Sequence, residues 1–405
     1  MAEIAGFVRP DYRSVEEVFS RTAPAQGGAS FAAYVEGELV ADLWTGTANG
    51  SPWQRDTLST VMSSTKGLAA LCAQVLWDRG ELDLDAPVTH YWPEYGQQGK
   101  SATLIRHVLT HTSGMLCFTD PGSVLDWDGN GWDDYDRIAE RIAGSPPAWK
   151  PGSRIGYHAI SVGWLLQEIV RRITGQTLGR FFAREVAEPL QIDVHIGTPE
   201  EAHGRLADIT ADESVNHGVL ARMLMTAYER EVARPGSRLG QAGVYMHGGT
   251  FSSHMAFFNK AKARLAEIPA ANASANARGL ARVYAMLAQG GELDGRRIVS
   301  PESISLFRTP SRIGRSAIRP RSGLLRAMPS PAMRYAMGFE GDFGKVPPPG
   351  RFGPTIATFG HLGAGGQIGF ADPELRVAGA FTRSHLGEWD VSTALIGALY
   401  ESLDR

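Results

Sequence analysis

Hydrophobic residues recur with two different periods along the chain, and these periods predict its strands and helices. Residues 30–44 (SFAAYVEGELVADLW) hold two β-rich pieces around Glu36-Gly37-Glu38, which predicts a hairpin. Residues 367–371 and 377–382 predict two more strands, separated by a turn at Asp372-Pro373-Glu374. Strands are therefore expected at both ends of the chain.

Helical periodicity dominates the middle of the chain. Residues 64–77 and 161–174 carry apolar side chains at helical spacing, and Gly80 and Gly175 follow them where a left-handed cap ends a helix. Further helices are expected over three segments: 104–110, 272–288 and 391–403. The remaining Gly- and Pro-rich stretches predict long loops with short helices near 115–156 and a surface-wrapping segment near 309–354.

The composition is that of an ordinary globular protein. With 405 residues, 43% hydrophobic and 20% charged, the chain can bury a large core as one big domain or two intimate ones. The net charge of -3 without runs of like charge favours a small-molecule partner over nucleic acid or membrane. Two cysteines, Cys72 and Cys117, are too few for a disulfide framework, and residues 1–7 do not read as a secretory signal. We therefore expect a cytoplasmic protein.

The tetrad Ser63-Ser64-Thr65-Lys66 carries the strongest chemical signal. Positions i and i+3 share a face of a helix, so Ser63 at a helix start would hold its hydroxyl beside the amine of Lys66. A neutral amine can take the proton of a serine hydroxyl, and burial favours the neutral form of lysine. The simpler alternative is that Ser63 caps the helix while Lys66 is a solvated residue of its first turn.

Six sequence blocks, in a fixed order over nearly the whole chain, surround this tetrad. They are VMSSTKGLAA (61–70), ELDLDAPVTHYWPEYG (81–96), LIRHVLTHTSGM (104–115), PGSRIGYHAISVGWLLQEIVRRITG (151–175), NARGLARVYAMLAQGGELDG (276–295) and FGHLGAGGQIGFADPE (359–374). Together they resemble the family of class C β-lactamases, DD-peptidases and related esterases.

The resemblance implies a β-lactamase/transpeptidase-like fold of the α/β (α+β) class. An antiparallel β-sheet flanked by helices is expected from residues 1–85 and 280–405, beside a mostly helical domain from residues 86–279. The active site is expected between the two parts.

The second motif of that family, Tyr-x-Asn, falls on Tyr157-His158-Ala159. The resemblance gives Tyr157 the role of hydrogen-bonding the nucleophile and shuttling its proton to the leaving group. A tyrosine packed at a loop edge with a satisfied hydroxyl is the structural alternative. Ala159 departs from the family pattern, because in lactamases the amide side chain there helps to hold the substrate's amide group. The departure argues against β-lactam substrates.

The third motif, Lys-Thr-Gly in lactamases, falls on His361-Leu362-Gly363, and related esterases carry His-x-Gly there. An imidazole is only partly charged near pH 7, so it would bind a lactam carboxylate less well than lysine does. A structural histidine beside a glycine-rich turn is the alternative for His361. The resemblance also makes the backbone N–H groups of Ser63 and Ala364 the donors to an oxyanion.

Aromatic and thioether side chains in irregular segments are candidates for an acyl or alcohol pocket, although ordinary core positions explain such residues as well. The candidates are Trp127, Trp132, Met115, Phe118, Tyr135, Tyr245, Met246, Phe257 and Phe258. His107 and His111 stand four apart, but in this family their segment is a structural helix and loop, so neither a metal nor a cofactor is expected. The chain also lacks G-x-S-x-G and H-E-x-x-H.

The sequence thus predicts a serine hydrolase that cleaves carboxylic esters through an acyl-enzyme on Ser63, as family VIII carboxylesterases do. Three alternatives stay open: an acyltransferase of the same fold acting on a natural product, a β-lactamase or DD-peptidase, and a binding protein without catalysis. The expected partner is a small-molecule ester, or an acyl donor with its acceptor.

Overall fold

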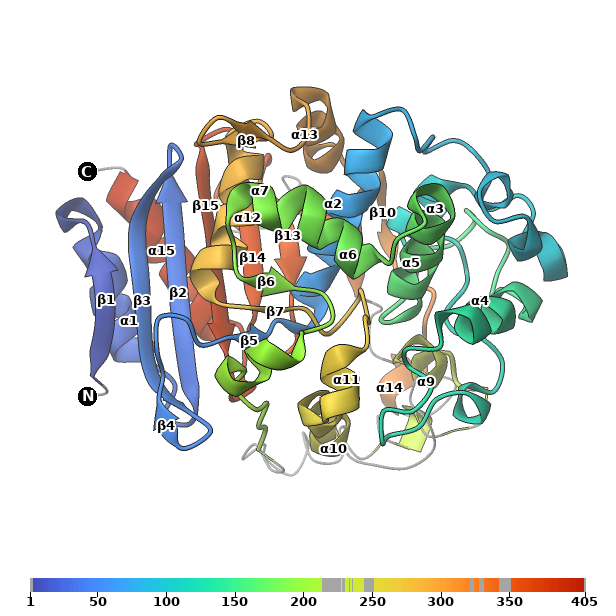
Figure 1. Cartoon of the computed structure of the whole chain (residues 1–405), viewed down its shortest axis with the longest axis horizontal. Helices are drawn as coiled ribbons and strands as arrows, with labels where there is room; N and C mark the ends of the chain where they lie inside the picture. The colour runs from blue at the N-terminus through green and yellow to red at the C-terminus, as the bar shows by residue number, and fades with distance from the viewer. Residues whose placement is uncertain are drawn as a thin grey trace.

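A large antiparallel sheet forms the centre of the protein. The computed structural model describes residues 3–212, 227, 230–232, 234, 236–243, 251–320, 324–327, 331–341 and 351–403. From edge to edge the sheet contains β1 (Ile4–Val8), β3 (Glu38–Ala48), β2 (Gly28–Val35), β15 (Val377–Arg383), β14 (Ile368–Asp372), β13 (Phe359–Leu362), β12 (Phe339–Gly341), β11 (Ala332–Ala336) and β10 (Arg312–Arg315), with β4 (Ser51–Pro52) beside β3. Strands from the two ends of the chain therefore pair in one sheet (Figure 1).

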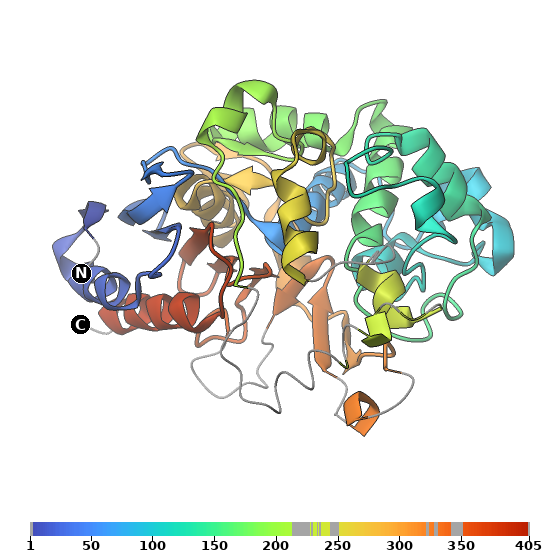
Figure 2. The same ribbon diagram turned by 90° about the horizontal axis from the view of Figure 1, so that it is seen from below.

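Helices cover both faces of this sheet. On one face, α1 (Arg13–Thr22) and α15 (Asp390–Leu403) pack on each other and on the inward side chains of β2 and β14, around Phe31 and Phe370. On the other face, α12 (Ala277–Ala288) lies along β15, β2 and β14, and α2 (Thr65–Asp78) lies against β13 and β12. Both termini lie on the side where α1 and α15 pack (Figure 2).

The predicted hairpin and helix ends are confirmed. Glu36 and Gly37 both have positive φ, 51° and 85°, as a two-residue turn between right-twisted strands requires. The helix α5 (Ser161–Thr174) ends at Gly175, whose φ of 71° is left-handed. A glycine at this position ends the helix without the strain that a Cβ atom would cause.

The predicted helix at 272–288 begins later than expected. Residues 274–275 form β7 (Ser274–Ala275), which pairs with β5 (Ser59–Thr60) and β6 (Val194–His195) in a small sheet. The side chain of Asn276 then accepts a hydrogen bond from the Gly279 amide at 2.7 Å and caps α12. Strand pairing with distant segments, which periodicity does not reveal, sets this boundary.

The prediction that residues 309–354 wrap the surface is wrong in part. The strands β10, β11 and β12 lie in this segment and extend the central sheet beyond β13. Each strand is at most five residues long. Alternation over so few residues, among Pro, Arg and Gly, is too short to be recognised as a strand.

The helices between α2 and α12 form the second part of the molecule. They include α3 (Ile105–Leu109), α4 (Tyr135–Gly144), α5, α6 (Leu178–Phe182), α7 (Glu188–Leu190), α9 (Arg238–Gly243), α10 (Phe251–Ala256) and α11 (Ala261–Leu265). Outside this part, α13 (Pro301–Arg308) packs on β11, and α14 (Leu324–Ala327) lies between β10 and β11 in the chain. The helix α2 packs on the sheet and also on α5 and α6, so one continuous core joins the two parts.

The expected fold class, an antiparallel sheet flanked by helices beside a mostly helical part, is confirmed. The domain boundaries at 85/86 and 279/280 stay a prediction. No helix within the described ranges is both long and apolar enough to cross a membrane.

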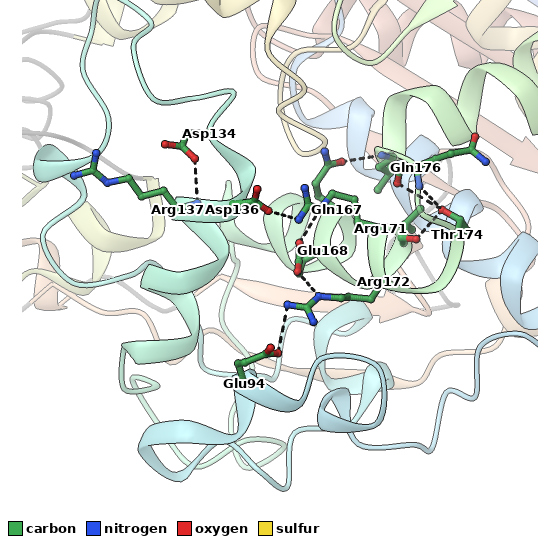
Figure 3. Close-up of polar contacts among 12 residues, drawn as sticks. Glu94, Asp134, Asp136, Arg137, Gln167, Glu168, Arg171, Arg172, Thr174 and Gln176 are labelled. Carbon is green, nitrogen blue, oxygen red and sulfur yellow. Dashed lines mark hydrogen bonds and ion pairs between the residues drawn. The ribbon is translucent and has the colours of Figure 1, made fainter.

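A buried carboxylate fastens α5 to its neighbours. Glu168 has a side chain only 3% exposed and accepts hydrogen bonds from Arg171 Nε at 3.0 Å and Arg172 Nε at 2.6 Å. Arg171 also pairs with Asp136 of α4, and Arg172 lies 3.3 Å from Glu94 (Figure 3). Glu168 thereby links three chain segments through two partly exposed arginines.

Replacing this carboxylate is expected to destabilise the protein. Glu168→Gln removes the buried charge and turns an NH2 group toward one of the two arginines, so the free energy of unfolding should fall by about 1–3 kcal/mol. Urea denaturation followed by circular dichroism measures this loss. The matched control is Asp136→Asn, whose carboxylate is 84% exposed; it should cost less than about 1 kcal/mol. Equal losses in the two variants would contradict a special role for the buried group.

Candidate active site

The predicted nucleophile lies in a tight turn before α2. Ser63 is the middle residue of the 3-10 turn η2 (Met62–Ser64), and the residue before it, Met62, has a positive φ of 50°. Thr65 holds the turn: its hydroxyl donates to Met62 O at 2.6 Å and accepts from the Ala273 amide at 3.0 Å. A strained residue fixed in this way is typical of functional sites.

Three predicted residues meet at this turn. Lys66 donates from Nζ to Ser63 Oγ at 3.0 Å and to Ala270 O at 2.7 Å. The Ser63 side chain is close enough to the phenol of Tyr157 to lower its pKa, and Lys66 Nζ lies 4.8 Å from the centroid of the Tyr157 ring. The structure thus brings the hydroxyl, the amine and the phenol together, although they come from positions almost one hundred residues apart in sequence.

Burial sets the protonation of the amine and the phenol. Lys66 is 3% exposed, and loss of solvation lowers its pKa to about 7, while the charge of Glu340 acts in the opposite direction. Burial raises the pKa of Tyr157 well above its usual value. Near neutral pH a large fraction of Lys66 is therefore an uncharged amine, and Tyr157 keeps its proton.

The end of β13 is fastened to the serine turn. Ser64, fully buried, donates its hydroxyl to His361 O at 2.9 Å. A Cβ atom on Gly363 would lie 2.4 Å from Val61 O and 2.6 Å from Gln367 Cβ. Glycine at 363 is therefore required for the close approach of β13 to the turn.

The two predicted oxyanion donors flank this contact. Ser63 lies in the turn and Ala364 directly after Gly363, on the two chain segments that Ser64 joins. Among the backbone hydrogen bonds that join loops and turns of the described chain, neither of these amides is a donor. This fits their predicted role as oxyanion donors.

His361 lies close to Tyr157 and is fully buried. Its Nδ1 atom is 2.8 Å from Leu362 O, and its ring centroid is 6.4 Å from that of Tyr157. Burial lowers the pKa of His361 to about 4. The ring is therefore neutral at pH 7, whereas the sequence led us to expect a ring that is partly charged.

The predicted pocket side chains lie mostly in the core. Trp132 is 3% exposed, donates from Nε1 to Asp126 O at 2.9 Å and packs on Trp164 and Phe257. Its indole packs in the core of the helical part, and its place in a substrate pocket stays a prediction. Trp127 is half-buried and stacks on His254 at 4.6 Å.

The other pocket candidates follow the same trend. Four of them are buried: Met115, Phe118, Phe257 and Phe258. The hydroxyl of Tyr135 accepts a hydrogen bond from the Glu267 amide at 2.9 Å. Tyr245 and Met246 lie outside the described residues.

The histidines at 107 and 111 use their ring nitrogens for the backbone. Nδ1 of His107 accepts from the Leu104 amide at 3.1 Å, and Nδ1 of His111 accepts from the His158 amide at 3.0 Å. The His111 ring also lies against Tyr157, with centroids 5.0 Å apart. Among the residues that the structure describes, no acidic, histidine and cysteine side chains group as a metal site.

A cavity of about 500 Å³ lies beside the Tyr157 segment and not on Ser63. Its walls come from the loop around Leu116 and Phe118, from Ala148 and from α9. The amide of Ala159, two residues after Tyr157, donates to Ala242 O of α9 at 3.1 Å. The cavity thus adjoins the segment that carries Tyr157, but the three converging residues do not line it.

Glu340 is the site residue that the sequence did not indicate. It lies on β12, inside the stretch expected to wrap the surface, and Tyr335 opposite it on β11 donates its hydroxyl to Glu340 Oε1 at 3.2 Å. Its Oε1 atom is 3.9 Å from His361 Nε2. Only a correct strand assignment for 332–341 would have placed this carboxylate near β13.

Known proteins are similar to this chain over almost its whole length. A family model described as Beta-lactamase matches residues 19–395. Esterase/beta-lactamase LipL of Mycobacterium tuberculosis (strain ATCC 25618 / H37Rv) is 33% identical over 392 residues, covering 95% of this chain and 83% of that protein.

Two solved structures share the fold over 99% of this chain and 100% of their own. One is a novel penicillin-binding protein homologue from Caulobacter crescentus, with a TM-score of 0.80 and 31% identity. The other is a family VIII carboxylesterase, with a TM-score of 0.81 and 30% identity.

The contact of β13 with the serine turn gives a test of this geometry. Gly363→Ala inserts a methyl group against Val61 O, so the amide of Ala364 should shift away from Ser63. We expect kcat/KM on a test ester to fall on the order of 100-fold, because small displacements of reacting groups can slow a reaction by this factor. Gly397→Ala is the control, because a Cβ atom there meets nothing within 4 Å. Full activity in both variants would contradict the required approach.

Proposed function

Because the chain belongs to the Beta-lactamase family, and because it is similar to proteins named as esterases, we propose that it hydrolyses carboxylic esters through an acyl-enzyme on Ser63. One observation carries the proposal: a buried amine, uncharged in large part near pH 7, lies 3.0 Å from the hydroxyl of Ser63. This is the arrangement that turns a weak nucleophile into an effective one.

In the first step, Ser63 Oγ attacks the ester carbonyl while Lys66 Nζ takes the hydroxyl proton. The developing oxyanion accepts hydrogen bonds from the amides of Ser63 and Ala364, neither of which is a donor among the backbone hydrogen bonds that join loops and turns of the described chain. Tyr157 keeps its proton near pH 7 and lies close to Ser63, so it can pass a proton to the departing alkoxide and regain one from Lys66.

In the second step, water attacks the acyl-enzyme. The proton of this water moves through Tyr157 and Lys66, and Ser63 leaves as the hydroxyl. Substituting another alcohol or an amine for water gives acyl transfer with the same residues. Product analysis with added acceptor alcohols separates transfer from hydrolysis.

Esters fit the site better than β-lactams do. Ala159 supplies no amide side chain at the second motif, and His361 is uncharged at pH 7 where lactamases carry a lysine. A β-lactam would therefore meet neither the amide side chain that holds its amide group nor the cation that holds its carboxylate in lactamases.

Removing the nucleophile is expected to abolish ester cleavage. Ser63→Ala should lower kcat on p-nitrophenyl butyrate by about 1,000-fold or more, since the acyl-enzyme can no longer form. Stopped assays with intact-mass detection should show an acyl adduct, and a fluorophosphonate adduct, on the wild type only. Ser300→Ala, in the distant cap of α13, is the control. Retention of full esterase activity by Ser63→Ala would refute the assignment.

The pH dependence of hydrolysis should report Lys66. The base must be uncharged, and burial lowers the pKa of this lysine to about 7. Log kcat/KM should therefore rise with unit slope as pH increases toward 7 and level off above it. Initial rates on a neutral ester, corrected for spontaneous hydrolysis, measure the profile. A rate already constant at pH 5 would show that the neutral amine of Lys66 is not the base.

A further inference from the structure

The carboxylate of Glu340 lies near the residues that converge on Ser63. Glu340 has a side chain 14% exposed, and Tyr335 holds its Oε1 atom by the 3.2 Å hydrogen bond across β11 and β12. The same atom lies 3.9 Å from Nε2 of His361 on β13. The acid therefore borders the position of the third motif, where lactamases carry a cation.

His361 places a second hydrogen-bond acceptor beside the Glu340 carboxylate. The Nδ1 atom of His361 lies 2.8 Å from the Leu362 carbonyl, which only accepts, so Nδ1 carries the ring proton and Nε2 presents a lone pair. Both His361 Nε2 and Glu340 Oε2 are buried without a hydrogen-bond partner in the described chain. Two acceptor atoms beside the third motif are thus left without a hydrogen-bond donor in the described chain.

The negative charge reaches the reacting groups. Glu340 raises the pKa of both Lys66 and Tyr157, and for neither group does an arginine act against it. Arg351 Nη1 lies 3.9 Å from Glu340 Oε2, but its side chain is 46% exposed, so solvent screens much of its charge. Arg351 affects His361 less than Glu340 does. The charge of Glu340 therefore acts on the two groups that converge on Ser63.

We propose that Glu340 determines specificity: it makes the site accept acyl groups that are neutral or cationic and reject acyl groups that carry a carboxylate. The charge of Glu340 would repel a carboxylate on the bound acyl group, and β13 offers no cation to offset this repulsion. The same charge would attract a cationic acyl group and leave a neutral one unaffected. This inference rests on the proposed esterase function.

Three p-nitrophenyl esters of similar shape test the proposal. They are the 4-(trimethylammonio)butanoate, its neutral isostere 5,5-dimethylhexanoate, and the anionic hemiglutarate. For the wild type, we expect kcat/KM on the anionic ester to be at least about tenfold below that on the neutral ester, and the cationic ester to be hydrolysed at least as well as the neutral one.

Glu340→Gln keeps the acceptor for Tyr335 and removes the charge. The anionic-to-neutral ratio of kcat/KM should rise about tenfold in this variant, and the cationic-to-neutral ratio should fall. Ratios measured at one pH cancel any change in the basicity of Lys66 and any loss of folded protein. Glu292→Gln, whose carboxylate pairs with Arg297 on the surface, is the matched control and should keep the wild-type ratios.

The outcomes separate this inference from the proposed function. A wild-type anionic-to-neutral ratio near one or above it would overturn the role of Glu340 while ester hydrolysis through Ser63 stands. Unchanged ratios in Glu340→Gln would overturn it as well. Failure of the wild type to cleave any of the three esters would overturn both proposals.

Discussion

The exclusion of water from the Lys66 amine is the constraint on which the site depends. An ammonium in this position would lack solvation, so burial shifts lysine toward its neutral form, and only that form can accept the Ser63 proton. Nζ contacts Ser63 Oγ and the Ala270 carbonyl. Ala270 O can accept from an amine or from an ammonium, so it orients Nζ in both protonation states.

The fold keeps this amine dry and its partners in place. Every residue of α2 from Thr65 to Leu76 is buried, between the sheet on one side and α5 and α6 on the other. The serine turn is tied to β13 by Ser64 and to the strand β7 segment by Thr65. Segments distant in sequence thereby converge on Ser63, and the continuous core makes their spacing a property of the whole molecule.

Local sequence patterns predicted those parts of the site whose residues are close together in the sequence. The S-x-x-K spacing places Ser63 and Lys66 on one helical face, and the glycine after α5 ends that helix as expected. The family resemblance supplied Tyr157, which no local rule places beside Ser63. What escaped prediction depends on pairing between strands: the short strands β10 to β12, the start of α12, and with β12 the position of Glu340. Trp132 shows the complementary limit, since an aromatic residue in an irregular segment can equally be core.

Charge accounts for the departure at the third motif. Replacing a lysine by His361 removes a cation, and burial keeps the imidazole neutral. A permanent cation on β13 would neutralise the Glu340 carboxylate beside it, whereas neutral His361 does not, and Arg351, 3.9 Å from Glu340 Oε2, is 46% exposed. The excess negative charge opposes deprotonation of Lys66, because it raises the pKa that burial lowers. Deep burial of the amine is therefore needed for it to act as a base near pH 7, and the same carboxylate that demands this burial biases the site toward acyl groups without an anion.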